Sequence, residues 1–125
     1  LEKLSIFDEE LEMRNEIDNN YRKQLNNAQH HPKEYQSAHA LFSITLDRMS
    51  QRDSLIKRLS KSKIPSVVYY KFPIHLMKAF SFLGYNEGDL QVSEKLSKTI
   101  VSLPMHPYLA QHDIEYIIKV LKTTK

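Results

Sequence analysis

The apolar residues of this chain recur at two spacings, which divide it into predicted helices and strands. Near the N-terminus they fall three or four positions apart from Leu4 to Leu25, with charged residues between them. This spacing predicts one long amphipathic helix over residues 4–25. It also predicts a surface helix over residues 50–61 and a C-terminal helix whose apolar residues are Ile114, Ile117, Ile118 and Leu121.

Alternating and β-branched stretches predict the strands. Residues 38–46 form a half-buried strand in this prediction, because side chains of a strand point alternately to its two faces. Its apolar side carries Ala38, Ala40, Phe42, Ile44 and Leu46. Residues 67–70 and 100–103 predict two further short strands. Between these strands we expect a short buried helix over residues 75–83, capped by Gly84, and a helix that starts near Asp89.

This order of elements predicts an α+β fold in which a small mixed sheet is flanked by helices, packed mainly against one face. The 125 residues are the length of a single domain, residues 1–125, and 41% hydrophobic residues suit a globular core. The chain begins at Leu1, within helical sequence and without an initiator methionine. We therefore expect a fragment or a processed product.

Composition excludes several functional classes. The net charge is only +3 and no basic tract is present, so nucleic-acid binding is not indicated. No apolar run approaches the roughly 20 residues that span a bilayer, so no membrane partner is expected. The chain has no cysteine, which excludes disulfides and thiolate chemistry and fits a cytoplasmic location. Its six histidines lack metal-ligand spacing, and its two glycines cannot build a phosphate-binding loop.

The segment Tyr69-Tyr70-Lys71-Phe72-Pro73-Ile74-His75 carries the strongest functional signal. A proline-fixed turn here presents aromatic faces and an imidazole on a loop of limited freedom. Such a surface suits a flat pyrimidine base and the hydroxyl groups of a sugar. The alternative interpretation is that Tyr69 and Tyr70 are core and interface aromatics, and that His75 only caps a helix.

Two further segments contain candidate residues. In the stretch 37–44, Phe42 lies on the apolar side of the predicted strand, and His39 points the other way, toward solvent, a partner or a cleft. In the stretch 102–109, two prolines flank Met105 and His106, which we interpret as architecture, with Met105 packed inside and His106 exposed or hydrogen-bonded.

The run from Ile64 to Leu109 resembles the C-terminal region of the DegT/DnrJ/EryC1/StrS family of pyridoxal-phosphate sugar aminotransferases. Residues 1–25 are similar to the long helix, with its Arg14-Asn15 pair, that opens the same region. The resemblance implies the C-terminal small domain of a fold-type-I aminotransferase, without its cofactor-binding large domain. It implies that Tyr70, Phe72, His75 and His39 line a nucleotide-sugar site, and it assigns this chain no catalytic residue and no metal ligand.

For the full-length enzyme, the resemblance implies transfer of an amino group from an amino acid, typically glutamate, to a keto-sugar attached to a nucleotide. Pyridoxal phosphate would be the cofactor and a homodimer the active form, in the biosynthesis of polysaccharides or amino sugars. Because the family's Schiff-base lysine lies upstream of this region, the chain alone is expected to bind no cofactor and to be inactive. The alternative is a stand-alone binding or interaction module from a split or truncated gene.

This sequence departs from the family pattern at two positions of interest. Lys71 stands where the family commonly has a proline, in the loop that carries the candidate substrate residues. Ala110 stands where a serine or threonine usually caps the last helix.

Overall fold

A two-stranded antiparallel sheet lies at the centre of the structure, a computed structural model that describes residues 2–30, 34–35 and 37–123. Strand β1 (Phe42–Thr45) pairs with β2 (Ile100–Leu103), with Phe42 opposite Leu103 and Thr45 opposite Ile100. Single-residue bridges extend the sheet on both sides, because Ala28 pairs with Ile44 and Val67 pairs with Ser102. The α+β class is therefore confirmed.

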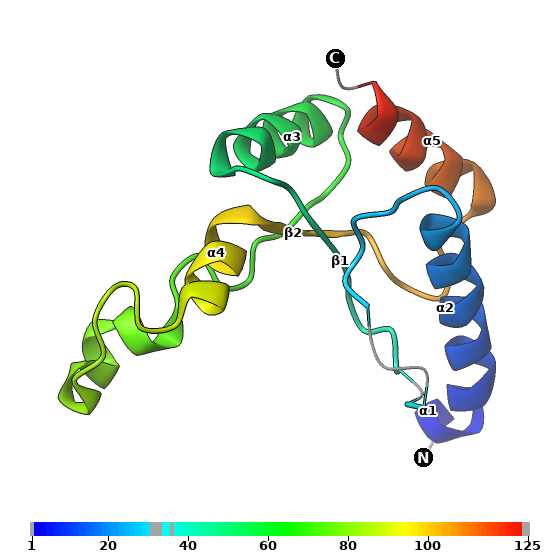
Figure 1. Cartoon of the computed structure of the whole chain (residues 1–125). Coiled ribbons are helices and arrows are strands. Elements are labelled where there is room, and N and C mark those ends of the chain that lie inside the picture. Colours follow the sequence, from blue (N-terminus) through cyan, green and yellow to red (C-terminus); the bar gives the residue numbers. More distant parts are fainter. Residues whose placement is uncertain (1, 31–33, 36, 124–125) are drawn as a thin grey trace.

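Helices surround this sheet, as Figure 1 shows. Their bounds are α1 Glu2–Ser5, α2 Phe7–Arg22, α3 Met49–Lys61, α4 Gln91–Thr99 and α5 Gln111–Lys122. Helix α3 contacts β2, α4 and α5, and α2 packs along α5. Because α4 leads directly into β2, the position of α4 relative to the core is set by the sheet.

The core forms where the apolar stripes of the helices meet the sheet. Tyr21 of α2 is 0% exposed, and its ring centroid lies 4.6 Å from that of Phe42 on β1. Leu59 of α3 and Ile114 of α5 are also fully buried. Burial of these side chains supplies the main driving force for folding, about 1.5 to 3 kcal/mol for each large side chain.

Residues 71–90 form a projecting arm that extends from α4 away from the core (Figure 1). The arm contains two 3₁₀ helices, η1 (Ile74–Leu76) and η2 (Lys78–Leu83). Throughout residues 65–100, which the structure describes completely, no side chain belongs to the buried hydrophobic core cluster. Other interactions must hold the arm in place.

The expectation of one helix over residues 4–25 was wrong at both ends. Ile6, with φ −110° and ψ 6°, separates α1 from α2, and α2 ends at Arg22. Leu4 and Phe7 are exposed, so no core contact enforces a continuous helix at this end. The predicted helix over residues 50–61 is confirmed as α3, and the C-terminal helix is confirmed as α5.

Two strand predictions were only partly right. The alternation expected from Ala38 begins at Phe42, and Ala38 and Ala40 are exposed. His39 takes a left-handed backbone conformation, with φ 45°, which interrupts an extended strand. The stretch 67–70 makes only the bridge at Val67, whereas the strand 100–103 is confirmed as β2.

The arm also differs from its prediction. The stretch 75–83 lies in two 3₁₀ helices rather than in one buried helix, and apart from the buried His75 its large apolar side chains are mostly exposed, because no core surface faces them. Gly84 ends η2 in the left-handed conformation, with φ 75°, as expected of a cap. Asp89 does not cap α4, since its carboxylate accepts the backbone N–H of Asn86 at 2.7 Å.

Candidate functional site

A cavity of about 840 Å³ lies between the base of the arm and the N-terminal part of α4. Its lining includes Tyr70, Phe72 and Ile74, and also Leu90, Val92 and Leu96. Its volume is in the range of small-molecule binding sites. The walls are mainly apolar, and among the described residues Asp89 is the one charged member of the lining. The cavity suits a ring system with a few hydroxyl groups.

Two of the four predicted substrate residues, Tyr70 and Phe72, lie together in this cavity. Their side chains are 65% and 69% exposed, so both rings are available for contact. Tyr69, at 55%, and Tyr70 are both too exposed to be core aromatics, and the interface part of that alternative stays a prediction. The exposed aromatic faces retain the stacking surface that the sequence predicted.

His75 is a buried residue of the arm itself, 7% exposed. Its Nε2 lies 3.2 Å from Oε1 of Glu94, and its ring meets that of Tyr85 edge-on at 6.0 Å. An ionised carboxylate only accepts hydrogen bonds, so Nε2 carries the hydrogen in this pair. His75 is not part of the cavity lining, and its contact with substrate stays a prediction.

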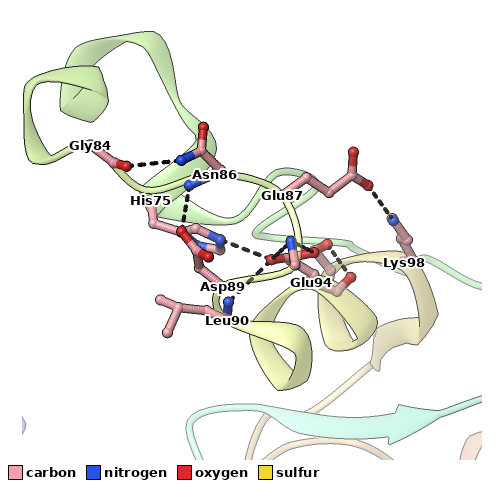
Figure 2. A network of polar contacts seen from close by, with 10 residues as sticks. His75, Gly84, Asn86, Glu87, Asp89, Leu90, Glu94 and Lys98 are labelled. Carbon is pink, nitrogen blue, oxygen red and sulfur yellow. Dashed lines mark hydrogen bonds and ion pairs between the residues drawn. The ribbon is translucent and has the colours of Figure 1, made fainter.

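Glu94, on the first turn of α4, is the centre of this buried cluster (Figure 2). Its carboxylate accepts the backbone N–H of Gly88 at 2.9 Å and that of Leu90 at 3.3 Å, besides the imidazole of His75. Burial alone raises the pKa of the Glu94 carboxyl. Together, the hydrogen bonds from Gly88, His75 and Leu90 lower the pKa by more than burial raises it. The pKa of Glu94 therefore lies below its usual value.

His39 is likewise buried and paired with a carboxylate. Its Nδ1 lies 3.2 Å from Oδ1 of Asp18 on α2. Asp18 also accepts two hydrogen bonds from the guanidinium of Arg22, one turn further along the helix. The structure therefore does not bring His39 together with Tyr70 and Phe72, and substrate contact by His39 stays a prediction.

The two carboxylates that hold these histidines were not predicted from the sequence. Asp18 and Glu94 each carried a signal, since Asp18 precedes Arg22 by four residues and Glu94 follows a glycine-containing turn in the first helical turn. Paired side chains four apart face one another on a helix. Neither signal reveals the partner histidine, because the histidines lie 19 and 21 residues away in sequence.

His106 is exposed and Met105 is partly buried against the core, as predicted for the stretch that follows β2. In the part of the chain that the structure describes, no group of three or more His, Cys, Asp or Glu side chains is arranged to hold a metal ion. No helix there is both long and apolar enough to cross a membrane.

The lysines of the described residues do not fit a pyridoxal-phosphate attachment site. Every one of them is exposed, including Lys71 and Lys95 near the cavity. A lysine that forms a Schiff base is activated by desolvation in a pocket or by a neighbouring cation. No step through the cofactor is therefore assigned to these residues.

The sequence matches the DegT/DnrJ/EryC1/StrS aminotransferase family over residues 1–122. It is 38% identical over 88 residues to a pleiotropic regulatory protein of Geobacillus stearothermophilus. This alignment covers 70% of the present chain and 24% of the Geobacillus protein. It is 40% identical over 76 residues to a dTDP-3-amino-3,4,6-trideoxy-alpha-D-glucose transaminase of Micromonospora megalomicea subsp. nigra, with 60% and 20% covered.

A solved structure of a DegT DnrJ EryC1 StrS aminotransferase from Brucella abortus superposes with a TM-score of 0.85 and 40% sequence identity. This alignment covers 98% of the present chain and 33% of the Brucella chain. The chain thus spans between 20% and 33% of the length of these relatives. By sequence and by fold, it belongs to the DegT/DnrJ/EryC1/StrS aminotransferase family.

Proposed function

We propose that this chain is the C-terminal domain of a pyridoxal-phosphate-dependent aminotransferase that acts on a nucleotide-linked keto-sugar. Membership of the family and the match to a relative named as a dTDP-amino-sugar transaminase support this proposal. The observation that carries it is the cavity in which Tyr70 and Phe72 present exposed rings opposite α4. The cofactor would supply the amino-transfer chemistry from the part of the protein that this chain does not include.

The residues of this chain would bind and orient the sugar nucleotide. The rings of Tyr70 and Phe72 would pack on the flat face of the base or on the sugar ring, and exclude water from it. Ser93 and Gln91, also in the lining, would offer hydrogen bonds to hydroxyl groups. Lys71, between the two aromatic residues in the sequence, is exposed, and its cation would be available to the phosphates of the nucleotide.

The wider proposal follows the family. The amino donor would be an amino acid, typically glutamate, and the product would enter the biosynthesis of polysaccharides or amino sugars in the cytoplasm. The active form would be a homodimer. Apolar surface is exposed in two places, at Leu4 and Phe7 near the N-terminus and along the arm. The rest of the enzyme would cover this surface.

The test separates the two half-reactions of the full-length enzyme. Tyr70→Ala and Phe72→Ala should each raise the KM for the sugar substrate about tenfold or more, because one stacked ring contributes about 1 to 3 kcal/mol. The half-reaction with the amino donor should stay within about twofold, since neither ring takes part in it. Unchanged kinetics with the sugar substrate would refute the assignment.

Tyr116→Ala provides the matched control. Tyr116 is a partly exposed tyrosine on α5, and it is not part of the cavity lining. Its replacement should leave both half-reactions unchanged. A loss of the same size in this variant would show that the effect comes from removing any exposed tyrosine.

A further inference from the structure

The projecting arm is attached to the domain by buried polar contacts rather than by a hydrophobic core. No buried member of the core cluster lies within residues 65–100, and within this stretch Val68, which precedes the arm, packs against the cluster. Glu94 of α4 is 7% exposed, and its carboxylate contacts both halves of the arm. The outgoing half contributes His75 at 3.2 Å, and the returning half contributes the N–H of Gly88 at 2.9 Å. One carboxylate therefore joins the two halves to each other and to the helix, as Figure 2 shows.

The same two halves of the arm build the cavity. Phe72, Pro73 and Ile74, directly before His75, belong to its lining, and so do Gly88, Asp89 and Leu90. Glu94 itself is not in the lining, and its carboxylate contacts both of these walls through His75 and Gly88. A displacement of its carboxylate would move both walls at once.

We propose that Glu94 is a positioning residue of the substrate cavity, which sets the distance between the aromatic side, Tyr70 and Phe72, and the N-terminal part of α4. The substrate part of this inference rests on the proposed function. His75 acts in it as the connection from the outgoing half of the arm to the carboxylate. Its edge-on contact with Tyr85 fixes the plane of the imidazole.

The ion pair between Glu87 of the arm and Lys98 of α4 cannot replace this contact. Lys98 and Glu87 lie 3.4 Å apart, but their side chains are mostly exposed. Exposed ion pairs contribute little because water and salt screen them. By contrast, hydrogen bonds to a buried carboxylate are strong, and their loss leaves buried donors without a partner.

Gly88 adds a second, independent requirement at this position. Its φ of 100° lies in a region that side-chain-bearing residues rarely adopt, although a Cβ would meet no atom within 4 Å. The glycine is therefore required by its backbone conformation and not by space. That conformation directs the Gly88 N–H at the Glu94 carboxylate.

The test combines a structural and a kinetic measurement on Glu94→Gln. The amide retains the shape of the side chain and one acceptor oxygen, but it removes the negative charge that strengthens the hydrogen bonds from Gly88, His75 and Leu90, and its nitrogen cannot accept the second contact from Gly88. In this chain, amide hydrogen exchange of residues 71–90 should become about tenfold faster, while β2 and α5 stay unchanged. In the full-length enzyme, the KM for the sugar should rise about tenfold with the donor half-reaction unchanged.

Glu87→Gln is the matched control, because it makes the same chemical change on the same arm at an exposed position. It should change neither measurement. If Glu94→Gln does not fold, Gly88→Ala provides a second test. Strain at φ 100° would shift its N–H from the carboxylate and should give the same two effects.

The outcomes separate this inference from the proposed function. Unchanged exchange in the arm would overturn the role of Glu94 outright. Faster exchange with an unchanged sugar KM, while Tyr70→Ala raises that KM, would overturn positioning but leave the proposed function standing. Equal losses in both half-reactions with a lower melting temperature would show a purely structural residue. If neither Tyr70→Ala nor Phe72→Ala affects the reaction with the sugar, the proposed function is refuted. The substrate part of the inference is then refuted as well, because it rests on that function.

Discussion

The hydroxyl of Tyr21 should stabilise the fold by about 1 kcal/mol, and Tyr21→Phe measures this contribution directly. Tyr21 is fully buried on α2, and its hydroxyl donates to the backbone carbonyl of Pro104 at 3.1 Å, directly after β2. Burial raises the pKa of the Tyr21 phenol, so the hydroxyl carries its proton at every pH at which the protein is studied. The hydrogen bond therefore does not depend on pH through the tyrosine.

The magnitude follows from the geometry. An intramolecular hydrogen bond contributes about 0.5 to 1.5 kcal/mol net, and 3.1 Å is slightly longer than the usual range for O–H donors. We therefore expect Tyr21→Phe to lower the free energy of unfolding by about 1 kcal/mol, or the melting temperature by about 4 °C. Tyr21→Ala, which also removes the ring from Phe42, should cost about 3 to 5 kcal/mol.

Urea unfolding followed by circular dichroism provides the measurement, with Tyr116→Phe as the control. Tyr116 on α5 is 48% exposed, and its hydroxyl lies 3.5 Å from the carbonyl of Ser62, at the limit of a hydrogen bond. This control should lie within about 0.5 kcal/mol of the wild type. Equal stabilities of Tyr21→Phe and the wild type would refute the argument that the contact to Pro104 stabilises the fold.

Three further predictions concern the arm, the cofactor and the last helix. The pKa of Glu94 is lowered in the fold, so its bonds to the arm should be at full strength above roughly pH 4 and be lost as the pH falls through the lower folded value. Between about pH 7 and pH 3, this is tested by the protection of the Gly88 amide, which is its exchange rate relative to that of an unstructured amide at the same pH. Glu94→Gln should remove the pH dependence of that protection. When this chain is treated with pyridoxal phosphate and then borohydride, a peptide map should show no stoichiometric adduct at a single lysine. The reason is that the described lysines are exposed and therefore lack the desolvation that activates a Schiff-base lysine. A stoichiometric adduct at one site would contradict this prediction. Ala110→Ser should raise the free energy of unfolding by about 1 kcal/mol, since α5 begins without a side-chain cap, and an unchanged urea midpoint would contradict it.

The parts of the fold that the sequence predicted are those that bury an apolar stripe. Leu55 and Leu59 on α3, and Ile114 and Ile117 on α5, recur at helical spacing because that spacing faces the core. Spacing could not predict the arm, whose attachment depends on hydrogen bonds rather than on apolar contact. The β-branched run at residues 67–70 likewise predicted a strand, but only Val67 has a partner on β2.

The candidate site was predicted in part for the same reason. Tyr70 and Phe72 lie in the cavity because large aromatic residues beside a proline turn have no core to enter. His39 was expected to face solvent, a partner or a cleft, and His75 to be presented on a loop or to cap a helix. The structure buries both beside carboxylates, Asp18 and Glu94. These pairings join residues distant in sequence, so only the three-dimensional arrangement reveals them.

The two bridges that flank the sheet also affect how the protein behaves when it is concentrated. A strand edge with free N–H and C=O groups is a template for pairing with another chain, and a sheet of two strands has two such edges. Here Gln29 donates to the carbonyl of Ser43 on one edge, and Val67 exchanges two hydrogen bonds with Ser102 on the other. The short connecting segments thus occupy the edges of β1 and β2 and protect the sheet against strand-to-strand aggregation between molecules.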